Sequence, residues 1–96
     1  MEPELRGIVK KIIDEHLTAD QVRYFIEAIQ QFKPIIKSDK DAIFGWLMGM
    51  LEARFLSIYF SSTRQAPRKE ELDELHHILR NRSYEIIDVI NRELMR

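Results

Sequence analysis

Small residues recur at every fourth position of one long apolar segment, which keeps an unbroken helical pattern from residue 39 to residue 61. The members of this small-residue row are Gly45, Gly49, Ala53, Ser57 and Ser61. Because glycine inside a helix costs about 1 kcal/mol relative to alanine, two glycines in one helix indicate that another backbone packs closely against the row. Packing, rather than catalytic chemistry, is therefore the strongest information in this sequence.

Composition fits one domain that spans residues 1–96. The chain is 45% hydrophobic and 32% charged, and its 15 basic and 16 acidic residues leave a net charge of -1. A nearly neutral chain has no overall positive field that would attract nucleic acid or an acidic membrane. There is no cysteine, which excludes disulfides and thiolate chemistry and fits a reducing compartment. The charged start of the chain lacks the apolar core of a signal peptide, so we expect a cytoplasmic location.

Apolar residues outside the long segment also keep the spacing of three and four residues that is typical of one helix face. This pattern predicts an all-α protein, a helical bundle of about four helices. Two of them are expected to form a short hairpin (3–16 and 19–33) and two a long hairpin (39–62 and 67–95).

Helix boundaries are marked by local signals. Thr18 and Ser38 are typical amino caps, and Pro34 disfavours helical geometry in the residue before it. We expect Phe32 to point inward at the end of the second helix and Glu71 to point outward early in the last one. The last helix has few core residues around Ser83, which predicts a kink or break there, with Ser83 able to cap a second segment.

The helix lengths do not match, which favours a homodimer. At 1.5 Å per residue, the long helices extend roughly 35 to 40 Å and the short ones only about 21 to 23 Å. Part of an apolar surface containing Trp46, Met48, Met50, Phe55, Tyr59 or Phe60 would then face water. Large exposed apolar patches mark interaction sites, and two-fold dimers are the commonest oligomers. The predicted interface consists of Gly45, Gly49, Ala53, Ser57, Trp46 and Phe60.

An alternative for the small-residue row is that it seats another helix of its own chain, since rows of residues four apart interlock at a crossing of about -50° in either case. A transmembrane span is a further alternative for residues 42–60. That window contains Glu52 and Arg54, each costly at the centre of a bilayer. We therefore expect no membrane insertion, and we expect this segment to be the most buried helix of the bundle.

A metal or small-ligand site is an alternative function. Glu74 and His77, like Asp73 and His76, have the three-residue spacing of ligands in carboxylate-bridged metal sites of helical bundles. The candidate ligands are Glu74, His76 and His77, with Glu52 as a further carboxylate. The second helix that such a site needs is missing from the pattern. The competing interpretation is one half-buried and one exposed histidine, and no cofactor is expected.

Anion binding is a hypothesis for the segment between the long helices. Arg64, Arg68 and Lys69 lie beside the start of the last helix, and helix amino termini bind anions readily. A solvated loop is the alternative, because Glu70 and Glu71 follow at once. Nucleic-acid binding is a third possible function, but the outward residues of the 19–33 helix form a nearly neutral set that does not suit base recognition.

Nothing in the sequence indicates an enzyme. A cysteine nucleophile, a Gly-x-Ser-x-Gly elbow and a phosphate-binding glycine loop are all absent from the sequence. The sequence therefore predicts a small non-enzymatic protein that acts as a homodimeric interaction or adaptor module, with itself and another protein as partners.

Overall fold

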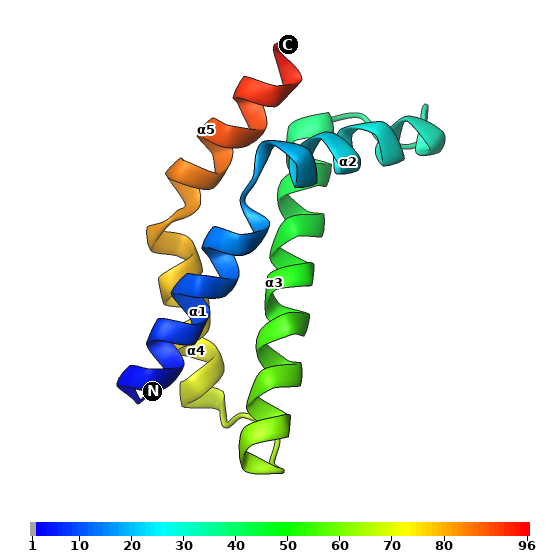
Figure 1. The fold of residues 1–96 in the computed structure, drawn as a ribbon. Coiled ribbons are helices and arrows are strands. Elements are labelled where there is room, and N and C mark those ends of the chain that lie inside the picture. The colour runs from blue at the N-terminus through cyan, green and yellow to red at the C-terminus, as the bar shows by residue number, and fades with distance from the viewer. Residues whose placement is uncertain (1) are drawn as a thin grey trace.

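The computed structural model describes residues 2–96, and within them it is all-helical (Figure 1). The elements are α1 (Pro3–His16), α2 (Ala19–Ile29), the 3-10 turn η1 (Gln30–Phe32), α3 (Asp39–Thr63), α4 (Lys69–Asn81) and α5 (Ser83–Leu94). The all-α prediction is confirmed. Within residues 2–96 there are five α-helices rather than about four, because the segment predicted as one helix over 67–95 forms two.

Amino caps begin α2 and α3 where the sequence predicts them. The Thr18 side chain accepts a hydrogen bond from the Gln21 amide at 3.2 Å, and the Ser38 side chain accepts one from the Asp41 amide at 3.3 Å. These bonds satisfy amides that have no partner within the first turn of a helix. Helix α3 ends because Arg64 takes a left-handed conformation with φ 59°, which cannot continue a right-handed helix.

The division of the last segment lies at Arg82, between α4 and α5. Ser83 does not cap α5, contrary to the prediction, since its hydroxyl donates to the Leu79 carbonyl at 3.1 Å. The second helix is also shorter than predicted. It leaves α-helical geometry after Ile29 and tightens into η1, which ends two residues before Pro34.

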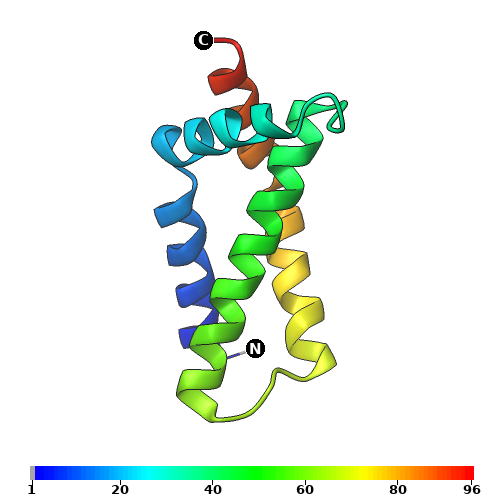
Figure 2. The same cartoon turned by 90° about the vertical axis from the view of Figure 1, so that its right-hand side faces the viewer.

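Helix α3 runs antiparallel to the α4–α5 segment, and α1 packs beside it (Figures 1 and 2). Helix α2 crosses the start of α3 at a steep angle and contacts both α3 and α5. The predicted hairpin of the first two helices is therefore wrong. Each buries its apolar face against α3, and α2 also against α5, rather than the two lying along each other.

The buried apolar side chains form one core between α1, α2, α3, α4 and α5. Five of them come from α3 at every fourth position, namely Ile43, Leu47, Leu51, Phe55 and Tyr59. The remaining members are Val9, Ile12, Ile13, Val22, Phe25, Ile29, Leu75, Leu79, Ile86 and Ile90. Only one side of α3 thus belongs to the core.

In the described part of the chain, two acidic residues, Glu71 and Glu93, are buried. Glu93 Oε1 lies 3.3 Å from Nε of Arg23, and its Oε2 lies 3.2 Å from Nε of Arg96. Glu71 lies 3.5 Å from Nη2 of Arg68. The prediction that Glu71 points outward is wrong, because it precedes Leu75 by one helical turn and shares its face. Buried charges require such partners.

An ion-pair cluster at the α4–α5 junction joins the last two helices to α1. Nη2 of Arg82 donates to Asp14 at 2.7 Å and to Glu85 at 2.8 Å. Replacing Arg82 by alanine is expected to lower the free energy of unfolding by about 1 kcal/mol, the upper value for exposed ion pairs. Urea unfolding of the two proteins measures this difference, and an unchanged midpoint would show that the cluster contributes nothing.

The same cluster gives the stability a pH dependence. Hydrogen bonding and the charge of Arg82 hold the pKa of Glu85 below its ordinary value of 4.5. A depressed pKa in the folded state stabilises the protein above the unfolded pKa, and this contribution disappears as the pH falls through and below 4.5. The stability difference between the wild type and Arg82→Ala should therefore narrow between pH 6 and pH 3.

Candidate functional site

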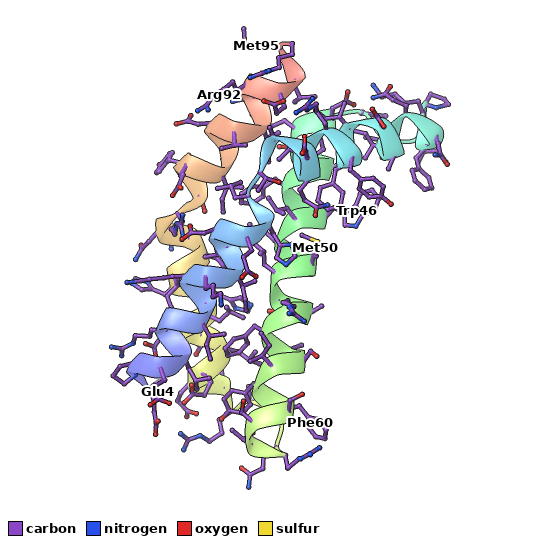
Figure 3. All side chains as sticks on the ribbon, viewed as in Figure 1. Glu4, Trp46, Met50, Phe60, Arg92 and Met95 are labelled. Atoms are coloured by element: carbon purple, nitrogen blue, oxygen red, sulfur yellow. The ribbon has the colours of Figure 1, made fainter. Side chains whose placement is uncertain are left out.

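The side of α3 opposite its buried residues carries the small-residue row. All five members of the row are exposed. A Cβ built on Gly45 or on Gly49 meets nothing within 4 Å. The alternative in which the row seats a helix of its own chain is therefore wrong for the described residues. Figure 3 shows Trp46 and Phe60 on this side of α3, which faces away from α1.

We call the exposed residues on this side the outer face of α3. They are Gly45, Trp46, Gly49, Ala53, Leu56, Ser57, Phe60 and Ser61. At 1.5 Å per residue they extend over about 24 Å, and none carries a charge. The charges of this stretch lie at the sides: Glu52 contacts His76 of α4, and Arg54 lines a hollow with Glu15 of α1. An uncharged face of this length is unusual on a chain with 32% charged residues.

An apolar hollow of about 380 Å³ adjoins the start of this face, in the corner between α2 and α3. Its lining consists of Ile29, Phe32, Ile35, Ile36, Ala42 and Trp46. The ring of Trp46 packs against Phe25, with centroids 4.6 Å apart, and lies 6.5 Å from the ring of Tyr24. The prediction that Phe32 points inward is wrong, since 51% of it is exposed.

The hollow and the outer face together form a large uncovered apolar surface. Five of their side chains and the adjoining Tyr24, whose ring lies 6.5 Å from that of Trp46, contribute most of it, with exposed fractions from 37% to 84%: Tyr24, Phe32, Ile35, Trp46, Leu56 and Phe60. Since a large side chain of this kind buries about 150 to 250 Å² when covered, they leave roughly 600 Å² open. That is the upper limit for the largest patch of a typical monomer, which is about 300 to 600 Å².

By length and composition alone, α3 is the one described helix that would suit a membrane span, and 28% of its most apolar window is buried. The sequence predicted the most buried helix of the bundle. Helix α3 does contribute more core residues than any other described helix, but its outer face is open. Helix α3 is apolar on two sides, and the core covers only one of them. An apolar helix face is normally buried, which indicates that a partner covers the second side.

The predicted metal ligands do not converge. Glu74 accepts a hydrogen bond from Nε of Arg6 on α1 at 2.5 Å, His76 contacts Glu52 on α3, and His77 is exposed. Among residues 2–96, no three histidine, aspartate or glutamate side chains lie close enough to hold a metal ion. The pair of His76 and Glu52 instead borders a groove of about 330 Å³ between α3 and α4, together with Phe44 and Met48.

The three residues predicted to bind an anion do not form one site, because two of them are paired with carboxylates and the third lies on the loop. Nζ of Lys69 donates to Asp73 at 2.9 Å, and this hydrogen bond and the charge of Asp73 raise the pKa of Lys69. Arg68 lies 3.5 Å from Glu71, and Arg64 ends α3 on an exposed loop. Two of the three positive charges are thus already balanced by carboxylates of α4.

The apolar hollow is the part of the site that sequence reasoning missed. Its residues come from the end of α2, the following turn and the start of α3, which only the crossing of α2 over α3 brings together. The adjacent Ile35 and Ile36 in a non-helical turn were the available signal. Comparison with protein-family models, with curated proteins and with solved structures finds no match to the chain.

Proposed function

We propose that the protein is a non-enzymatic interaction module that works as a homodimer, paired through the outer face of α3. The observation that carries this proposal is an exposed, uncharged helix face about 24 Å long that nothing among residues 2–96 covers. A stable interface buries about 800 Å² on each partner. The six large side chains supply most of that area, and the small residues between them supply more.

A second copy fits this face because the face combines large and small residues. Leu56 and Phe60 have large exposed side chains, while the glycines and Ala53 have almost no side chain and Trp46 lines the hollow. Protruding side chains that enter the depressions of an identical face produce the self-complementary contact of a two-fold dimer. The charged remainder of the surface stays in water and is available to a further protein, as an adaptor requires.

The oligomeric state tests the proposal directly. Light scattering during gel filtration is expected to give a mass near twice 11.5 kDa at high concentration, with a monomer appearing on dilution. A mass that stays at 11.5 kDa over the whole concentration range would refute the homodimer.

A pair of glycine variants ties the dimer to α3. Gly7 of α1 and Gly49 of α3 are both exposed, both inside helices, and have no atom within 4 Å of an added Cβ. Alanine at either position should raise monomer stability by about 1 kcal/mol. Only Gly49→Ala should also weaken the dimer, because its methyl group separates the two backbones. Equal dimer affinity for both variants, measured by sedimentation, would place the interface elsewhere.

A further inference from the structure

The apolar hollow lies under an overhang. Helix α2 crosses the start of α3 and projects past it, so η1 and the turn that follows stand out beyond the outer face (Figures 1 and 2). Trp46 lies below this overhang (Figure 3). The molecule is thus concave at the start of α3, while the exposed Phe60 stands near the other end of the same face.

The protein's own Phe60 cannot fill its own hollow. Phe60 lies fourteen residues from Trp46 on the same straight helix, which is about 21 Å at 1.5 Å per residue. A second copy can supply it, provided that the two α3 helices run in opposite directions. Ala53 is midway between Trp46 and Phe60, so an antiparallel pair centred on Ala53 places each Phe60 opposite the other copy's Trp46.

The small residues of the outer face also fit an antiparallel pair centred on Ala53. In an antiparallel pair about Ala53, Gly45 lies opposite Ser61, and Gly49 lies opposite Ser57. Small residues therefore lie level with small residues on both sides of Ala53, and the two backbones can approach closely where the helices cross there. The aromatic side chains of Trp46 and Phe60, which attract each other, lie level in this register, and Leu56 lies level with Met50 of the other copy.

A parallel pair is disfavoured by shape and by charge. It would bring both α2 overhangs to the same end, where they compete for the same space. It would also place the two Arg64 side chains, which directly follow α3, at the same end of the pair. The antiparallel pair separates them and sets each Arg64 near Asp41 of the other copy, while Asp39 is already paired with Lys33 at 2.8 Å.

We infer that two copies of the chain pair antiparallel about Ala53, with Phe60 of each copy seated in the apolar hollow of the other beside Trp46. This inference rests on the proposed homodimer and adds its direction, its register and the occupant of the hollow.

Single cysteines test the register, since the chain has no cysteine of its own. A disulfide forms only when the two Cα atoms approach to about 4.4 to 6.8 Å. Under mild oxidation, Ala53→Cys is expected to form a covalent dimer. Ser61→Cys is expected to stay unlinked, because two Ser61 residues are about 24 Å apart along the helix axes in the antiparallel pair. Arg54→Cys, beside the outer face, is the control and should also stay unlinked.

The outcomes distinguish failure of this inference from failure of the proposed homodimer. Cross-linking of both Ala53→Cys and Ser61→Cys would show a parallel pair and overturn the inference. Light-scattering dimers in which Ala53→Cys remains unlinked would overturn the register and leave the homodimer standing. A chain that stays monomeric at every concentration, or that binds lipid vesicles as a monomer, would overturn both.

The occupant of the hollow is tested by Phe60→Ala. Loss of a buried aromatic anchor is expected to raise the dimer dissociation constant at least about tenfold. Tyr84→Ala removes an even more exposed aromatic ring from α5 and should leave the constant unchanged. If Phe60 contacts Trp46 of the other copy, the double variant with Trp46→Ala loses less affinity than the two single losses combined. If the affinity losses of the two single variants simply add, Phe60 does not contact Trp46 of the other copy and does not occupy the hollow.

Discussion

Replacing Ala53 by glutamate is expected to raise the dimer dissociation constant at least about 100-fold, so that the protein is monomeric at ordinary concentrations. Ala53 is exposed and lies in the middle of the uncharged outer face of α3. A charge buried in an interface without a partner costs several kcal/mol, and a factor of 100 corresponds to about 2.7 kcal/mol. In an antiparallel dimer the two new carboxylates also repel each other.

Sedimentation equilibrium measures the dimer dissociation constant of Ala53→Glu. Circular dichroism during urea unfolding shows whether the monomer of this variant remains folded. Folding should be preserved, because Ala53 is exposed on the surface of α3. The matched control is Tyr84→Glu, which adds the same charge at an exposed position of α5. A dimer that survives Ala53→Glu, or one that Tyr84→Glu disrupts equally, would contradict pairing through α3.

Features of the fold that depend only on residues adjacent in the sequence could be predicted from the sequence. Helix α3 begins and ends within one residue of its predicted bounds, because Ser38 and the two aspartates after it fix its start locally. Helix α1 has the predicted bounds as well. Caps and helical periodicity are properties of a few consecutive residues, and they do not require knowledge of the packed structure.

Features that depend on how helices pack could not be predicted. The crossing of α2 over α3 decides that Phe32 is exposed and that an apolar hollow forms beside Trp46. The burial of Glu93 depends on Arg23, seventy residues away in the chain. Periodicity marks both sides of α3 as apolar, and only the packed structure shows which side the core leaves open.

The candidate site illustrates the same division. The small-residue row was visible as a pattern, yet the same pattern allowed packing within the chain or between chains. Exposure of Gly45 and Gly49 in the folded chain removes the first alternative. The histidines had the spacing of metal ligands, but the rotation of α4 turns Glu74 toward α1 and His76 toward α3. Spacing within one helix does not fix where its neighbours lie.

Replacing two phenylalanines of α3, five residues apart, by alanine is expected to change the stability of the monomer by very different amounts. Phe55 is 1% exposed and its ring centroid lies 5.8 Å from that of Tyr59, whereas Phe60 is 54% exposed. Phe55→Ala leaves a cavity in the core and should lower the free energy of unfolding by about 3 to 5 kcal/mol. Phe60→Ala should change it by less than about 0.5 kcal/mol when the protein is monomeric.

Urea unfolding at concentrations below the dimer dissociation constant measures both effects, because dimerisation would otherwise add to the apparent stability. The same two variants should reverse their order in a dimerisation assay when each is folded: Phe60→Ala loses affinity, while Phe55→Ala retains the outer face and pairs normally. A stability loss for Phe60→Ala comparable to that of Phe55→Ala would show that the outer face belongs to the core of the monomer. One side of α3 would then no longer be free for a second copy.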